Sequence, residues 1–166
     1  MFRRLLSVVF ILCSFATTLL SCKKDPAPST NITGDYLIIG HMGGFINPSS
    51  FQRYYIITAT NLMADTTILA GNNPTGLAQF NFSYTLPDTC FQKVKLLPNQ
   101  IPVALLSQNN TTVGQMSLAD VGYLDVRSRL NGVEYKWLFG NELSACDTAV
   151  QGFVHRLGAG LENLPQ

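Results

Sequence analysis

Short segments rich in Tyr, Ile, Leu and Thr alternate along the chain with clusters of Gly, Pro, Asn and Ser. Asp35 to Met42 and Arg53 to Thr60 are of the first kind and predict two strands. Gly43 to Ser50 lies between them and predicts a loop, so we expect an antiparallel hairpin with a long connection. Leu62 to Leu69 predicts a further short strand.

Apolar residues occupy every second position from Gln79 to Leu86. A period of two is typical of a half-buried strand, so the segment predicts one strand with one apolar face. The residues that would share this face are Phe80, Phe82, Tyr84 and Leu86.

Asn131-Gly132 is the strongest local signal, because Asn and Gly both accept the positive φ angles of a type I′ turn. A two-residue turn fixes the pairing of the flanking strands, with Arg129 opposite Glu134 on a mostly charged side. A slip of one residue would expose Trp137, so we expect a fixed register. The residues on the other, mostly apolar side are Leu124, Val126, Ser128, Leu130, Val133, Tyr135, Trp137 and Phe139.

A kinked helical region is predicted between the strands. Asp88 is the expected N-cap of a helix over Thr89 to Leu97, which Pro98 should end or kink. Ile101 to Gln108 predicts a second short helical stretch, and Asn109 to Gly114 predicts a loop.

The end of the chain predicts another helix, with Asp147 as its N-cap and Gly158 at its C′ position. Its apolar residues share one face at helical spacing: Ala149, Val150, Phe153, Val154 and Leu157. Strands with segregated helices indicate an α+β domain. We expect a small antiparallel sheet covered on one face by the kinked helical segment and the C-terminal helix.

The first residues predict export rather than fold. Arg3 and Arg4 precede a mostly apolar, uncharged run from Leu5 to Leu20, and then come Ser21 and Cys22. A charged start, an apolar core and a small residue form a secretory signal. A transmembrane anchor is the weaker interpretation, because the run is shorter than the ~20 residues that a spanning helix needs.

Leu19-Leu20-Ser21-Cys22 resembles the lipobox of bacterial lipoproteins, in particular those of Bacteroidota-type bacteria. The resemblance implies cleavage before Cys22 and lipid on its thiol and amine. The alternative is an ordinary signal peptide with a chance cysteine. Lys23 follows the cysteine in place of the Asp that marks inner-membrane retention in enteric bacteria, which favours the outer membrane. The expected organisation is a signal peptide at 1–21, a lipidated N-terminus and flexible tether at 22–31, and one globular domain at 32–166.

Charge indicates no partner for the mature chain. Loss of Arg3 and Arg4 from the 11 Lys and Arg residues leaves nine, against ten Asp and Glu. The remaining basic residues form no cluster, so a nucleic-acid footprint is missing. The expected membrane contact is the lipid on Cys22, and a protein partner stays open.

Two cysteines, Cys90 and Cys146, remain once Cys13 leaves with the signal and Cys22 is lipidated. Disulfides persist in the oxidising compartments that receive exported proteins. We therefore expect a Cys90–Cys146 disulfide, with two separate buried thiols as the alternative.

The chain offers little for catalysis. Its only histidines are His41 and His155, and no metalloprotease, nucleophile-elbow, Cys-x-x-Cys or phosphate-loop motif is present. The sequence predicts no catalytic residue, no metal site and no cofactor.

The loop residues Gly43, Gly44, Phe45 and Ile46 are the main binding candidates. Glycines followed by two apolar residues put apolar side chains at a loop tip, and loops on a rigid scaffold commonly carry recognition. The alternative is that the glycines form a bulge and Phe45 folds back into the core.

The order of elements also resembles emfourin-type inhibitors of thermolysin-like metalloproteases. The resemblance implies inhibition of a secreted metalloprotease. The chain departs from that family in its lipid anchor, its longer interhelical stretch and its two cysteines, and no inhibitory residue is carried over. The residues that carry the resemblance are Gly43-Gly44-Phe45, Leu86-Pro87, Tyr123 to Val126, Tyr135-Lys136-Trp137 and Val150 to Leu157.

These features together predict a membrane-anchored envelope lipoprotein with a non-enzymatic binding domain. Three alternatives stay open: a protease-inhibitor-like protein, a structural subunit of an envelope complex, and an enzyme whose site the sequence does not reveal.

Overall fold

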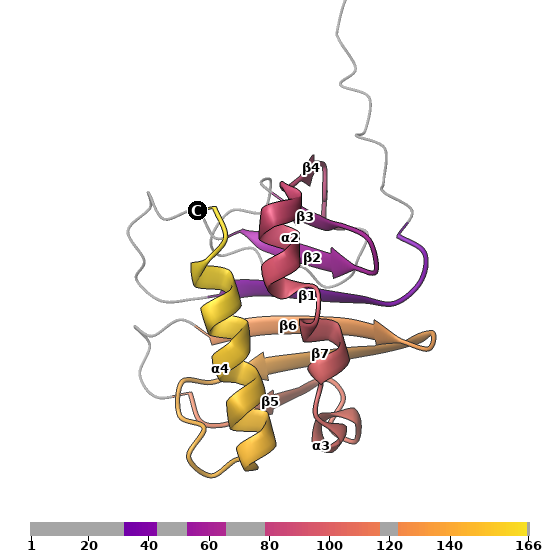
Figure 1. Cartoon of the computed structure of the whole chain (residues 1–166). Helices are drawn as coiled ribbons and strands as arrows, with labels where there is room; N and C mark the ends of the chain where they lie inside the picture. Colours follow the sequence, from indigo (N-terminus) through magenta and orange to yellow (C-terminus); the bar gives the residue numbers. More distant parts are fainter. Residues whose placement is uncertain (1–31, 43–52, 66–78, 117–122, 166) are drawn as a thin grey trace, which may run out of the picture.

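A computed structural model of the chain describes residues 32–42, 53–65, 79–116 and 123–165 (Figure 1). These residues form a seven-stranded sheet with the order β4-β3-β2-β1-β6-β7-β5. All neighbouring strands are antiparallel except β5 and β7, which are parallel. The strands are β1 (Tyr36–Met42), β2 (Tyr54–Thr58), β3 (Leu62–Asp65), β4 (Tyr84–Thr85), β5 (Thr111–Val113), β6 (Tyr123–Leu130) and β7 (Val133–Phe139).

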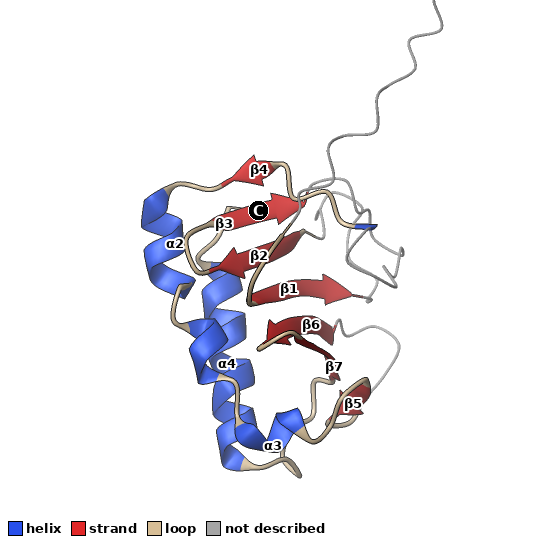
Figure 2. Cartoon of the chain, turned by 90° about the vertical axis from the view of Figure 1, so that its right-hand side faces the viewer, coloured by secondary structure: helices blue, strands red, loops and turns tan. Residues whose placement is uncertain are grey.

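The named helices lie on one side of this sheet (Figure 2). The α+β prediction is therefore confirmed, with a kinked helical segment and a C-terminal helix against an antiparallel sheet. The helical elements are α2 (Asp88–Val94), the 3-10 helix η3 (Leu97–Gln100), α3 (Val103–Leu106) and α4 (Thr148–Glu162). None of these helices is both long and apolar enough to cross a membrane.

The predicted β6–β7 hairpin is confirmed in position and register. Asn131 and Gly132 have φ angles of 51° and 80°, as a type I′ turn requires. Val126 pairs with Trp137, and Arg129 pairs with Glu134. The β1–β2 hairpin is confirmed as well, with Ile38 opposite Ile56.

The strand predicted over Gln79 to Leu86 is confirmed only at Tyr84–Thr85, which pair with β3. The Ser83 amide donates to the Asn81 carbonyl (2.9 Å), and this tight turn interrupts the extended chain. The alternating residues therefore separate: Phe80 and Phe82 are buried on the side opposite the helices, Leu86 is buried on the helix side, and Tyr84 is 55% exposed.

Three further boundaries differ from the prediction. Pro87 is the N-cap of α2, and Asp88 is the first helical residue. Thr111–Val113 form an edge strand where a loop was expected. Helix α4 continues past Gly158 to Glu162, because Leu161 extends its buried face by another turn. Asp147 caps α4 as predicted, accepting from the Ala149 amide at 2.7 Å.

The core consists of two buried clusters, one on each side of the sheet. The helix-side cluster contains Trp137, Phe153 and Leu157, all fully buried, and the Trp137 indole N–H donates to the Leu105 carbonyl (3.0 Å). The residues of the cluster on the opposite side are Tyr36, Ile38, Tyr54, Ile56, Phe80 and Phe82. The sheet is thus buried on both faces over its central strands.

Candidate functional site

Two of the predicted sites lie outside the described residues. Gly43, Gly44, Phe45 and Ile46 follow β1, whose last residue is Met42. Cys22, the expected lipidation site, precedes Ile32, the first described residue. Both stay predictions from the sequence.

The predicted disulfide is absent from the structure, because Cys90 and Cys146 are both free. Cys90 lies in α2, which runs beside the C-terminal half of α4 (Figure 1), whereas Cys146 lies just before the N-cap of α4. The 15 residues of α4 span about 22 Å at 1.5 Å per residue, and a disulfide needs Cα atoms about 4.4–6.8 Å apart. Each thiol is half-buried against the helix-side core.

The two histidines are not brought together with other ligand-type residues. His41 is exposed on β1, and His155 is exposed on α4. In the described part of the chain, no three His, Cys, Asp or Glu side chains are placed so that they could hold a metal ion.

The structure instead contains a buried polar cluster that the sequence analysis missed, formed by Tyr54, Asp65, Asp125 and Arg127. Arg127 Nη2 lies 2.7 Å from Asp125 Oδ2, and both side chains are buried. Tyr54 Oη donates to the same Asp125 oxygen at 3.2 Å. Asp65 accepts from the Asn81 amide at 2.6 Å. The cluster lies on the side of the sheet opposite the helices.

Strand register explains how this polar cluster forms. Asp65 pairs with Tyr54, Tyr54 with Gly40, and Gly40 with Asp125. These pairs form one row of residues across β3, β2, β1 and β6, and three members of the row belong to the polar cluster. A Cβ atom on Gly40 would lie only 2.4 Å from the Tyr54 ring. Gly40 therefore leaves the space in which Tyr54 crosses β1 and reaches Asp125.

Aromatic residues close the polar cluster. The Arg127 guanidinium lies 5.1 Å from the centre of the Phe80 ring, and Phe80 stacks on Phe82 with ring centroids 5.2 Å apart. Burial, followed by the charge of Asp125, raises the pKa of the Tyr54 hydroxyl, so this tyrosine stays protonated. Arg127 and Asp125 bond to each other, and the Asp65 carboxylate accepts from a backbone amide, which suits a structural role better than activation of a substrate.

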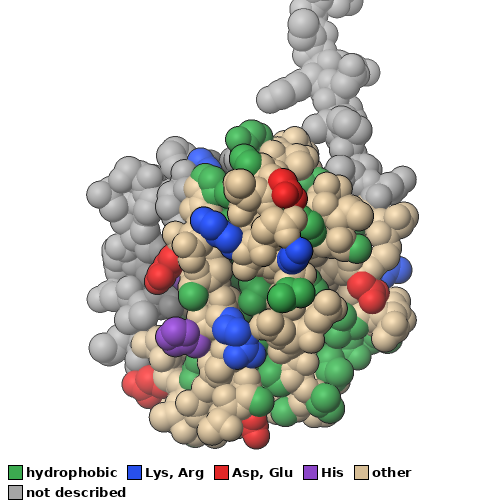
Figure 3. Space-filling model, viewed as in Figure 1, with side chains coloured by type: hydrophobic (Ala, Val, Ile, Leu, Met, Phe, Trp, Pro, Cys, Tyr) green, Lys and Arg blue, Asp and Glu red, His purple; other side chains and the backbone are tan. Residues whose placement is uncertain are grey.

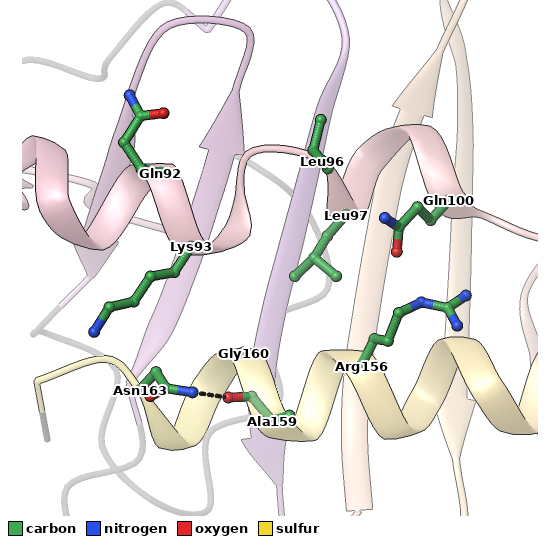
Figure 4. A pocket seen from close by; sticks show the side chains of 9 residues that line it. All are labelled: Gln92, Lys93, Leu96, Leu97, Gln100, Arg156, Ala159, Gly160 and Asn163. Carbon is green, nitrogen blue, oxygen red and sulfur yellow. Dashed lines mark hydrogen bonds between the residues drawn. The ribbon is translucent and has the colours of Figure 1, made fainter.

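An open groove of about 270 Å³ runs between the α2–η3 segment and α4; we call it the α2–α4 groove (Figure 4). Lys93 extends from α2 toward the C-terminal end of α4, and Arg156 extends from α4 toward Gln100. The helices approach closely where Gly160 faces Leu97, since a Cβ on Gly160 would lie 3.2 Å from Leu97 Cδ1. The lining residues are Gln92, Lys93, Leu96, Leu97, Gln100, Arg156, Ala159, Gly160 and Asn163.

The α2–α4 groove is cationic. Among the described residues, Lys93 and Arg156 line it and no carboxylate does. Neither Lys93 nor Arg156 forms an ion pair with another of the described residues. Lys and Arg side chains are visible on this face of the molecule (Figure 3). The buried Gln100 Oε1 atom has no hydrogen-bond partner among the described residues.

The sequence held only weak signals for these two sites. Gly40 inside a strand indicates a close approach of another group, and Asp125 with Arg127 places opposite charges on one strand face. Lys93 and Arg156 are far apart in sequence, and no spacing relates them.

Comparison with known proteins adds no relative. No family model matches the chain, and neither a curated protein nor a solved structure matches it.

Proposed function

We propose that the chain is an exported envelope lipoprotein, anchored through lipid on Cys22, whose α+β domain binds a protein partner. The observation that carries the anchor is the order of Arg3-Arg4, the apolar run Leu5 to Leu20, and Ser21-Cys22. Each part of that order serves one step: the charges orient the signal, the apolar run enters the export machinery, and the cysteine accepts the lipid. Lys23 after the cysteine favours the outer membrane.

Anchoring by lipid frees the domain from contacting the bilayer itself. One acyl chain gives marginal, reversible binding, and two or more anchor a protein stably. Asp25 to Asn31 contains two prolines with one Ser, one Thr and one Asn, which is typical of a polar tether. At about 3.5 Å per residue, a tether of residues 22–31 reaches at most about 35 Å from the membrane. The surface of the domain is then available for a partner within that distance.

Binding, rather than catalysis, suits the polar groups of the described residues. In the polar cluster Arg127 is paired with Asp125, and the Phe80 ring covers the Arg127 guanidinium. The α2–α4 groove, in contrast, presents two cations and several amides at the surface. A surface with unpaired charge of one sign is suited to an oppositely charged partner.

Metabolic labelling with an alkyne fatty acid tests the anchor. We expect the intact protein to take up label and to sediment with membranes, and Cys22→Ala to lose both properties. Cys13→Ala is the matched control, because it changes a cysteine within the signal and should keep the label. Labelling that survives in Cys22→Ala, or membrane association without any label in the unmodified chain, would refute the lipid anchor.

A further inference from the structure

The α2–α4 groove carries a more specific inference about the partner. We propose that it binds an acidic, extended peptide segment of another protein, with carboxylates on Lys93 and Arg156. This inference rests on the proposed function, since it names the kind of partner that the anchored domain would hold.

The two cations lie on opposite walls of the groove. Lys93 comes from α2 and Arg156 from α4, and Figure 4 shows them toward different ends. A single small anion would meet one of them, whereas a chain with spaced carboxylates could meet both. The guanidinium of Arg156 also offers the planar donor pair that suits a carboxylate.

The Gln100 side chain favours a peptide over a simple anion as the ligand of the groove. Its buried Oε1 atom is an acceptor and needs an N–H or O–H donor. Acetate supplies no such donor, but a peptide backbone supplies an N–H at every residue except proline. Gln92 and Asn163 add amide groups that can bond to the same backbone.

Apolar surface lies between these polar groups. Leu96 is 59% exposed at the groove, and Leu97 is buried at its floor beside Gly160. An apolar side chain of the peptide would cover Leu96 and remove its surface from water. A volume of about 270 Å³ suits a few side chains rather than a folded domain.

The other segments of this chain carry few of the carboxylates that the groove cations would bind. The segments outside the described residues contain two carboxylate side chains, Asp25 and Asp120. Asp25 follows Lys23 and Lys24, which the groove cations would repel, and Asp120 is a single charge. Two spaced carboxylates therefore point to another molecule.

Fluorescence anisotropy with the full chain in mild detergent tests the proposal. The probe is a labelled eight-residue peptide of Glu, Asp and Leu with blocked ends, and its control carries Gln and Asn at the acidic positions. We expect the acidic peptide to bind and the amide peptide not to bind. Exposed charge pairs contribute up to about 1 kcal/mol each, so Lys93→Gln and Arg156→Gln should each weaken binding by up to about fivefold.

Matched variants test whether peptide binding depends on the groove or only on the overall charge of the protein. Lys95→Gln removes the same charge from an exposed residue next to α2 that does not line the groove, and should leave the affinity unchanged. Gln100→Leu should weaken binding without lowering the midpoint of thermal unfolding, because it removes an unpartnered acceptor.

Several results would overturn the proposal: equal binding of the amide peptide, equal weakening by Lys95→Gln, full competition by free acetate, or a preference for phosphatidylglycerol vesicles over the peptide. Loss of peptide binding with normal lipid labelling rejects the groove alone. Peptide binding by a chain that takes up no lipid rejects the anchor alone.

Discussion

The two faces of the central sheet are both buried, but they are built differently. On the helix side, Trp137 and Phe153 pack among aliphatic residues, and the one polar atom of Trp137 bonds to the Leu105 carbonyl. On the opposite side, Ile38 and Ile56 lie beside an ion pair between Asp125 and Arg127. One face is held by apolar packing, and the other combines packing with charge.

This difference shows that burial alone does not determine what a residue contributes. Removing two charges from water costs several kcal/mol per ion, and the attraction between them offsets that cost only with good geometry. Asp125 has such geometry, because it accepts from both Arg127 and Tyr54. We infer that the polar cluster fixes strand register more than it adds net stability.

The largest expected effects come from breaking either face at its centre. Asp125→Ala leaves the buried Arg127 charge without its carboxylate and should lower the free energy of unfolding by about 3–5 kcal/mol. Trp137→Ala leaves a cavity on the other face and should cost about the same, about 3–5 kcal/mol. Urea denaturation followed by circular dichroism measures both losses.

A double variant separates the two causes. Asp125→Leu combined with Arg127→Met removes both charges of the ion pair and keeps apolar volume, so we expect it to recover part of the stability that Asp125→Ala loses, while the buried Tyr54 hydroxyl, left without its acceptor, keeps it below the parent chain. No second change should rescue Trp137→Ala in this way. A double variant as unstable as Asp125→Ala would show that the ion pair itself stabilises the fold.

Local patterns predicted much of the fold. The Asn131-Gly132 turn and the capping of α4 by Asp147 depend on neighbouring residues, so the sequence was sufficient to identify them. The strand expected over Gln79 to Leu86 is reduced to Tyr84–Thr85, because the residues of this segment pack in two different clusters. Alternation indicates an extended chain, but it cannot show that the chain turns at Asn81.

The candidate sites depend on contacts between distant segments. The sequence places Asp125 and Arg127 together on one strand face. They are buried because Tyr54 and Phe80, which lie much earlier in the chain, contact them. The groove likewise depends on α2 lying beside α4, which puts Lys93 near Asn163. Neither arrangement follows from spacing within one element.

A smaller effect is expected from Gly40, which allows the polar cluster to cross β1. In Gly40→Ala, the new Cβ would lie 2.4 Å from the Tyr54 ring, so the ring must move away from Asp125. Overpacking of this kind costs about 1–3 kcal/mol. The matched control is Gly158→Ala in α4, where nothing lies within 4 Å and stability should rise by about 0.5–1 kcal/mol. Equal behaviour of the two variants in urea denaturation would contradict the role assigned to Gly40.

The smallest effect concerns pH, and it again involves the face opposite the helices. Burial, and then the charge of Glu134, raises the pKa of Tyr36 to about 12, and its hydroxyl donates to Glu134 Oε1 at 3.3 Å. An unfolded tyrosine has a pKa of about 10, so the unfolded chain loses this proton first. The stability that Tyr36 contributes is therefore complete below pH 10 and is lost as the pH rises to about 12.

Tyr36→Phe should make the alkaline loss of stability shallower, while lowering stability at neutral pH by about 1 kcal/mol or less. The measurement is urea denaturation at several pH values between neutrality and the folded pKa of Tyr36. Tyr84→Phe is the control, because Tyr84 is 55% exposed and its hydroxyl should leave the slope unchanged. Identical alkaline slopes for Tyr36→Phe and the parent chain would mean that burial on this face does not protect the Tyr36 proton. The polar cluster would then be the main pH-sensitive part of the sheet, since burial also raises the pKa of Tyr54.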